Sequence, residues 1–520
     1  MLSIISKNGE DELMLQDIPN YKLSQNYIWY GEFDVNIDGK TYHFTGSMKY
    51  TPNETFWLEL LVSPDCDLTD KFMNNPFLLS GKEIIIKGVV SEAFESKLEY
   101  ATVYCSFNNQ NWGSNLSKTQ SLGETIIPEV RLNKLIFKVN ICLFHNNSCF
   151  KDDEIKCVQC KFNEAFDDLF YEMDLLGKRN KSVTLCNKEV KISENKVLHI
   201  AECFNSFLEN NDSLIKNNFY SDDKELLQVC AKSVENILNK SKSKISRIDK
   251  STQNIIPFMS YVNGTLLEVF KDIQIISDYF RLVSWNYTLC AEEVIVTTKY
   301  SDTPFSILYC LPFLEIKKYE VNINNLPTYV QRNKVFLKND NYLQPIKNFF
   351  ENYSNLGNCI FLLNENHYSR RFTSLYLGRT IDALAAIARY KQINKSEKYQ
   401  KVLNLFFESY PNIIKKIDKI LENVKCSDLQ ENDTKDIIRG KKISTLRTQI
   451  VHFDFSKDKH LPNIEKVIKL MEIFECLICD FIFEIINVDE EVRSSLLKQQ
   501  ENLCLSLIHI SEPTRRTPIS

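Results

Sequence analysis

The chain has 520 residues, 43% of them hydrophobic and 12% aromatic, which excludes an intrinsically disordered protein and predicts two or three globular domains. Its formal net charge of −5 excludes a uniformly basic polyanion binder, so any surface for nucleic acid must be local. The 16 cysteines are irregularly spaced, no signal peptide opens the chain, and no run of about 18 apolar residues occurs. We therefore expect a cytoplasmic protein with reduced thiols and no membrane segment.

Residues 1–160 predict β-structure. Tyr27–Ile37 and Thr41–Tyr50 flank Asp38-Gly39, a dipeptide that tolerates the positive φ of a tight hairpin turn. Further strands are expected at Phe56–Val62, Glu83–Val90, Glu99–Phe107 and Leu135–Leu143. Strands at this spacing indicate an antiparallel sandwich or a barrel-like domain.

Residues 161–335 predict mixed structure. The apolar spacing of Thr265–Leu282 is helical, and Ala291–Tyr300 has the composition of a strand. The pattern leaves open whether this region is a separate domain or completes the N-terminal one.

Residues 341–490 predict an all-α bundle, which makes the fold class α+β and multidomain. The expected helices are Phe372–Tyr390, Glu397–Val424 with a break near Pro411, Asp433 to His452, and Ile464–Ile486. The last of them carries an apolar stripe with the 3.6-residue period of an amphipathic helix.

The most informative motif, LRTQIVHF at Leu446–Phe453, places Arg447 and His452 near the end of the third helix. Metal-free RNA cleavage needs proton transfer at the 2′- and 5′-oxygens and stabilisation of a phosphorane. Histidine suits the first task, because its reference pKa is about 6.5, and the planar fork of arginine suits the second. One imidazole cannot easily serve both sides of an in-line reaction, so the motif predicts a symmetric dimer with two such pairs.

Charge around the motif is consistent with a bound polyanion. From Tyr368 to Arg447 the chain holds 17 Lys or Arg against 9 Asp or Glu, including Lys441 and Lys442 next to the motif. Arg370 and Arg371 open the bundle and are candidates for phosphate contact. The alternative is that these cations are solvated helix faces.

The C-terminal segment resembles the HEPN superfamily, specifically its Apea-type branch. The matching pieces are SRRFTSLYLGRTIDALAAIARY at Ser369–Tyr390 and LRTQIVHFD at Leu446–Asp454. FRLVSWNYTLCAEEVIV at Phe280–Val296 resembles the N-terminal module of that branch, which assigns 1–335 to the module and 341–490 to the HEPN bundle. The resemblance implies a dimeric, metal-independent endoribonuclease of an antiphage, abortive-infection system. It also implies transfer RNA as a target and an N-terminal module that senses a phage-derived activator or restrains the nuclease.

Two positions depart from the branch. Thr448 stands where Asn frequently follows the motif Arg, and Asp382 is the nearest acid to the Glu that the opening helix often carries. The alternatives to the enzyme are a non-catalytic HEPN bundle that binds RNA or a protein, and a purely structural interaction protein.

Cysteines offer a second candidate site. Cys157 and Cys160 form a CxxC pair, and with Cys142 and Cys149 they have enough thiols for one zinc ion, although the spacing is not that of a known zinc module and favours unrelated thiols. No Gly-rich phosphate-binding loop occurs, so nucleotide hydrolysis is disfavoured and no cofactor is expected. Residues 505–520 contain LSLIHISEPTR, which resembles the conceptual translation of a sequencing adapter and is not expected to be folded protein.

Overall fold

The structure is a computed structural model of the chain. It describes residues 3–4, 21–52, 55–63, 66–68, 71, 78–79, 83–93, 97–107, 116–118, 130–132, 134–145, 150, 154–162, 171–173, 179–182, 188–210, 213–220, 245–284, 289–299, 301–310, 343–368, 374–391, 411–422, 424, 426, 428–451 and 464–494. The chain forms two compact units: unit 1 is Met1–Asp167, Leu185–Gln274 and Thr288–Glu320, and unit 2 is Asp168–Thr184, Ile275–Tyr287 and Val321–Ser520.

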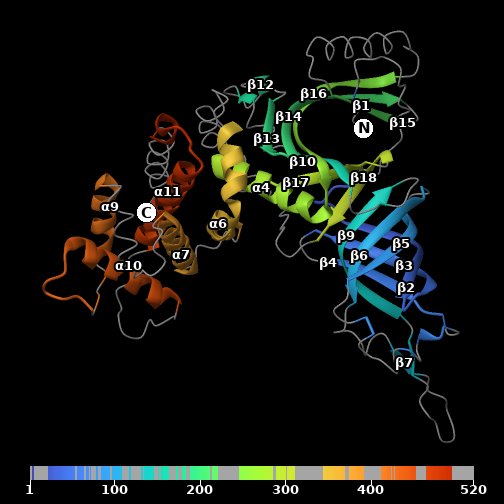
Figure 1. Cartoon of the computed structure of the whole chain (residues 1–520), viewed down its shortest axis with the longest axis horizontal. Helices are drawn as coiled ribbons and strands as arrows, with labels where there is room; N and C mark the ends of the chain where they lie inside the picture. Colours follow the sequence, from blue (N-terminus) through green and yellow to red (C-terminus); the bar gives the residue numbers. More distant parts are fainter. Residues whose placement is uncertain are drawn as a thin grey trace, which may run out of the picture. The chain divides into compact units, whose positions relative to one another are not determined.

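Unit 1 is built on one 14-stranded sheet in the order β1-β15-β14-β16-β10-β17-β18-β9-β4-β3-β2-β5-β6, with β13 also paired to β14 (Figure 1). Its strands are β1 (Ser3–Ile4), β2 (Tyr27–Ile37), β3 (Lys40–Thr51), β4 (Thr55–Leu61), β5 (Glu83–Glu92), β6 (Glu99–Phe107), β9 (Lys134–His145), β10 (Ile155–Phe162), β13 (Lys188–Ser193), β14 (Lys196–Asn210), β15 (Ser213–Tyr220), β16 (Ile245–Gly264), β17 (Ala291–Thr298) and β18 (Ser301–Tyr309). Two short ribbons, β7 (Leu116–Lys118) with β8 (Val130–Leu132) and β11 (Tyr171–Met173) with β12 (Arg179–Ser182), lie outside it.

Six of these strands close on themselves. β6 pairs with β9 as well as with β5, so β9, β4, β3, β2, β5 and β6 form a ring and leave none of the six at a free edge. Residues alternate in burial along β2, as a strand with one face on a core requires. Trp29 and Phe33 are fully buried inside the ring, where the ring centroid of Phe144 lies 5.0 Å from that of Trp29.

Paired glycines let the ring bend. Gly31 of β2 lies directly opposite Gly46 of β3, and a Cβ on Gly31 would stand 2.2 Å from the carbonyl oxygen of Val89. Because a side chain cannot occupy that space, the backbones of β2 and β5 approach closely at this point. The β2–β3 turn has Asp38 and Gly39 at φ of 51° and 80°, which confirms the hairpin expected from the dipeptide.

The strands expected from the sequence are confirmed within two residues at each end. Of the two expected architectures, the barrel-like one describes the six strands of the ring. The middle region completes the N-terminal sheet, because β10, β13–β16, β17 and β18 all join it. Helix α4 (Leu266–Ser284) and strand β17 occur where they were expected.

Unit 2 is mainly helical and also contains the β11–β12 ribbon and the second half of α4, so the mixed α+β class is confirmed (Figure 1). Its helices are α6 (Leu343–Tyr368), α7 (Ser374–Lys391), α9 (Pro411–Leu421), α10 (Lys435–Val451) and α11 (Ile464–Ile485). Helix α7 packs against α6, α10 and α11, and α9 packs against α10 and α11. α9 begins at Pro411, where a break was expected, while residues 397–410 lie outside the described residues. None of the described helices is both long and apolar enough to span a membrane.

The apolar stripe expected for the last helix is buried in its central part, and there the other faces of the helix are buried as well. Every residue from Phe474 to Phe483 of α11 is buried, including the acids Glu475 and Asp480. A helix buried all round is the centre of a bundle and not one of its outer members. Arg493 approaches Asp480, with 3.7 Å between Nε and Oδ1.

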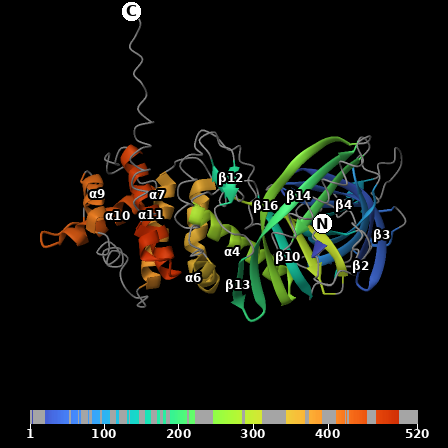
Figure 2. The ribbon, with the colours of Figure 1, turned by 90° about the horizontal axis from the view of Figure 1, so that it is seen from above.

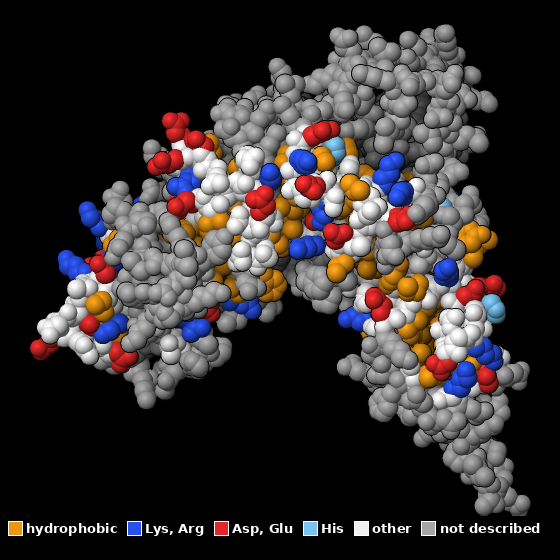
Figure 3. Space-filling model, viewed as in Figure 1, with side chains coloured by type: hydrophobic (Ala, Val, Ile, Leu, Met, Phe, Trp, Pro, Cys, Tyr) orange, Lys and Arg blue, Asp and Glu red, His pale blue; other side chains and the backbone are white. Residues whose placement is uncertain are grey.

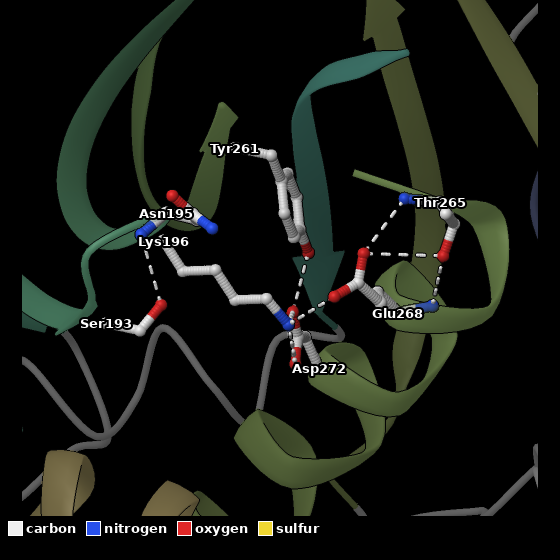
Figure 4. Close-up of polar contacts among 7 residues, drawn as sticks. All are labelled: Ser193, Asn195, Lys196, Tyr261, Thr265, Glu268 and Asp272. Carbon is white, nitrogen blue, oxygen red and sulfur yellow. Dashed lines mark hydrogen bonds and ion pairs between the residues drawn. The ribbon is translucent and has the colours of Figure 1, made fainter. Parts of the chain in front are cut away.

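A buried ion pair fixes the first turns of α4 to the sheet (Figure 4). The Nζ of Lys196, on β14, lies 3.1 Å from Oδ2 of Asp272 and 3.3 Å from Oε1 of Glu268. The hydroxyl of Tyr261 donates to Asp272 at 2.9 Å. Thr265 and Glu268 form a capping box, in which each side chain accepts a hydrogen bond from the other's backbone N–H. Burial raises the pKa of Asp272 above its ordinary value although Lys196 opposes the shift.

Removing the cation should therefore destabilise unit 1. We expect Lys196→Met to lower the free energy of unfolding by about 3 kcal/mol, because a carboxylate with 3% side-chain exposure loses its ion pair. Urea unfolding followed by tryptophan fluorescence measures the change, since Trp29 and Trp57 lie on ring strands. The matched control is Lys40→Met, whose exposed pair with Asp67 has a similar Nζ–Oδ2 distance of 3.0 Å and should leave the midpoint unchanged. Equal shifts in both variants would contradict the assignment.

Candidate functional site

Helix α7 has one narrow, solvent-accessible line of residues along its length between Leu377 and Ile387. Between Leu377 and Ile387 every residue is buried except Arg379, Asp382 and Ala386, which recur at three- and four-residue steps. Residues at these steps share one face of a helix. The packing of α7 against three other helices therefore leaves Asp382 on the one line of this stretch that solvent reaches.

Arg447 meets that line from α10. Ile443 and Leu446 are fully buried, and Arg447 stands at the edge of the stripe they form. Its Nε donates to Oδ1 of Asp382 at 2.5 Å and its Nη2 donates to Oδ2 at 3.2 Å. The side chains remain 34% and 38% exposed. A bidentate, partly solvated guanidinium of this kind can exchange a carboxylate for a phosphate, because both present two oxygens to the same fork.

The second member of the motif is not described. α10 ends at Val451, and His452, the next residue, lies outside the described residues. The same holds for Arg370, Arg371 and Cys149, and for 505–520. The structure therefore unites Arg447 with Asp382, two of the residues singled out from the sequence.

The other supporting candidates make contacts within unit 2. Thr448 is exposed, and its hydroxyl donates to the backbone carbonyl of Ser444 at 2.9 Å. Lys441 donates to Asp433 at 2.7 Å, and together with the N–H of Gln430 it lowers the pKa of that carboxyl.

Lys442 donates to the carbonyl of Leu421 at 2.8 Å, at the C-terminal end of α9. A lysine there satisfies carbonyls that the helix leaves without partners. These contacts give Lys441 and Lys442 structural roles that need no RNA.

Exposed cations are found instead on α9, where Lys415, Lys416 and Lys419 face outward. Figure 3 shows Lys and Arg side chains over this helix, with acidic ones beside them. Some of the excess basic residues in this part of the sequence thus lie on the surface, with acidic residues among them.

Arg439, also on α10, was missed by the sequence reading. It is 4% exposed and forms two hydrogen bonds with Asp418 of α9, at 2.6 and 2.9 Å, and one with Asp436 at 2.8 Å. The spacing of Asp436 and Arg439 is a local signal that could have indicated an ion pair. The link to Asp418 has no such signal, because it depends on how α9 and α10 pack.

The thiols considered for zinc are separated. Cys142 lies on β9 and Cys160 on β10, with β18 and β17 between them, so three strand spacings of about 4.8 Å part the two. Burial raises the pKa of Cys157 to about 12 and raises that of Cys160 well above its ordinary value, which favours the protonated thiol over a metal-binding thiolate. Among the described residues no group of three or more His, Cys, Asp or Glu is placed to hold a metal ion.

Comparison of the chain with family models, with curated proteins and with solved structures gave no match.

The two arginines of α10 should differ in their effect on stability. We expect Arg439→Met to lower the free energy of unfolding by about 2 kcal/mol, because a nearly buried side chain loses three charge-assisted hydrogen bonds. Arg447→Met should change it by less than about 1 kcal/mol, since its pair is a third exposed and screened by water. Thermal unfolding of both variants followed by circular dichroism tests this. A larger loss for Arg447→Met would make that residue structural.

Proposed function

We propose that unit 2 carries a HEPN-type ribonuclease, a metal-independent endoribonuclease of an antiphage abortive-infection system with transfer RNA as the first substrate to test. The observation that supports it is the position of Arg447. This arginine of the motif lies beside the solvent-accessible line of α7, with a partly exposed side chain, and not in a dry core. A polynucleotide phosphate can approach a guanidinium in that position.

In this proposal the reaction proceeds by attack of the RNA 2′-hydroxyl on the adjacent phosphorus. One His452 imidazole takes the 2′ proton, and the His452 of a second copy of the chain gives a proton to the departing 5′-oxygen. Arg447 donates to two oxygens of the phosphorane. The products are a 2′,3′-cyclic phosphate and a 5′-hydroxyl.

Asp382 competes with RNA for the hydrogen-bond donors of Arg447. Its carboxylate occupies the donors of Arg447 that a phosphate would need, so RNA binding exchanges one ion pair for another. Unit 1, under the same proposal, senses a phage-derived activator or restrains the nuclease, a role that rests on the family resemblance alone.

The second candidate is a non-catalytic bundle that binds RNA or a protein. One observation favours it: Arg447 is bonded through both Nε and Nη2 to Asp382, as a structural arginine is. The two candidates differ in whether bound RNA is cut.

We expect the purified chain to cut transfer RNA in the presence of EDTA, and His452→Ala to reduce the rate at least about 100-fold, because a proton-transfer group is lost. Arg447→Lys should also reduce it, since an ammonium cannot replace the planar fork. Product ends are identified by their resistance to, or labelling by, polynucleotide kinase. His43→Ala is the matched control, because that histidine is an exposed residue of β3 and should leave cleavage unchanged.

A parallel assay in cells tests the case in which the chain cleaves RNA only when an activator is present. Growth of cells expressing wild-type, His452→Ala and Arg447→Ala chains is compared with and without phage infection. Toxicity that survives His452→Ala, together with salt-sensitive RNA retention without cleavage, would establish the binding module in place of the enzyme.

A further inference from the structure

Three neighbouring strands of unit 1 bring a serine, a histidine and a glutamate into one hydrogen-bonded line. The Oγ of Ser260, on β16, lies 3.2 Å from Nε2 of His199, on β14. The Nδ1 of the same ring lies 3.2 Å from Oε1 of Glu189, on β13. Figures 1 and 2 show these strands side by side.

Strand register explains why the three side chains share a face. Glu189 is directly opposite His199 across β13 and β14. Ser260 is opposite Val197, two residues before His199, and residues two apart on a strand point to the same side. The ring of Phe258, the direct partner of His199 on β16, stacks on the imidazole with 4.4 Å between centroids and 6° between planes. The imidazole is thus held in orientation by both neighbouring strands.

The partners of the ring indicate where its proton lies. A carboxylate only accepts hydrogen bonds, so Nδ1 donates to Glu189 and Nε2 is the acceptor that faces the serine hydroxyl. A nucleophile in contact with a base, which is in turn oriented by a third group, is the arrangement that activates serine in enzymes of unrelated folds. The side chain of His199 is 16% exposed and Ser260 is partly exposed, so a small electrophile can reach them.

We propose that Ser260 is an activated nucleophile that accepts the acyl group of an activated ester or thioester. Its Oγ forms a bond to the acyl carbon while its proton passes to Nε2 of His199. The bond from that carbon to the leaving oxygen or sulfur breaks, and the leaving group takes the proton from Nε2. Water then releases the acid by the same two transfers, and Glu189 acts as a positioning residue.

The neighbourhood limits the substrate class. Ser260 is ladder-paired with Val197 on one side and Cys157 on the other, so the backbone amides of these three described residues lie in the sheet and do not form an oxyanion hole. The substrate must therefore carry a good leaving group. Val262, two residues along the same face and 61% exposed, offers contact for a short apolar acyl chain.

The test uses the full-length chain with p-nitrophenyl acetate as substrate and a fluorophosphonate as covalent probe. We expect peptide mapping of the wild-type adduct to place it on Ser260. Labelling should be lost in Ser260→Ala and slowed about 100-fold in His199→Gln, the usual contribution of a general base. Ser47→Ala is the matched control, since Ser47 is a partly exposed serine on another strand of the same sheet and should not alter labelling.

The role of Glu189 has its own readout. The charged residues on this face of β13 are Glu189 and Lys191, and the facing residues of β16, Phe258 and Ser260, are uncharged. Glu189→Gln should move the midpoint of the pH–labelling curve to lower pH, because the imidazolium loses its carboxylate. A structural role for Glu189 would leave the midpoint in place.

An adduct mapped to another residue, or a His199→Gln chain labelled at the wild-type rate, would overturn the proposal and reduce the three residues to a polar contact on a sheet face. Because these residues all lie in unit 1, neither result depends on the proposed ribonuclease of unit 2.

Discussion

The all-round burial of Phe474–Phe483, the central part of α11, is the constraint on which unit 2 depends. A helix with ten consecutive buried residues needs neighbours on every side, and α6, α7 and α9 pack against it. Helix α7 contacts α6 and α10 as well, so most of its own surface is also covered. What remains uncovered is the line that carries Asp382. The exposure of the Arg447 pair thus follows from the packing of the central helix and not from any property of the pair itself.

The ion pairs of this protein differ in how far the side chain of the cation is buried, and this difference indicates which pairs are structural. The side chain of Arg439 is 3% exposed and that of Lys196 is 20% exposed, and each joins two packed elements. That of Arg447 is 34% exposed, and that of Lys40 is 56% exposed. Because removing one partner of a buried pair leaves the other charge without solvent, the free-energy cost of breaking a pair falls along this series. Arg447 lies where a pair still orients the side chain but can be exchanged for another anion.

Local patterns in the sequence predicted what is locally determined. The Asp38-Gly39 turn and the helical spacing around Arg447 need only neighbouring residues, and both elements occur as expected. Helix α6 was not predicted as a separate helix, because six asparagines weaken its helical pattern. One of them, Asn348, donates to the backbone carbonyl of Ile486, which is far away in the sequence. Ring closure between β6 and β9 and the contact of Asp382 with Arg447 join residues far apart in the chain. No periodicity within one element contains such information.

A paired guanidinium also bears on how the proposed ribonuclease would be controlled. When RNA displaces Asp382, the net gain is the difference between two similar bidentate interactions, so Arg447 alone adds little affinity. Affinity must then come from other cations, such as the exposed lysines of α9, or from a second copy of the site. In a symmetric pair of chains one scissile phosphate would face two guanidiniums, each paired with the Asp382 of its own chain while RNA is absent. In the proposed ribonuclease the ion pair would thus orient Arg447 without adding to RNA affinity, and the other cations would supply that affinity.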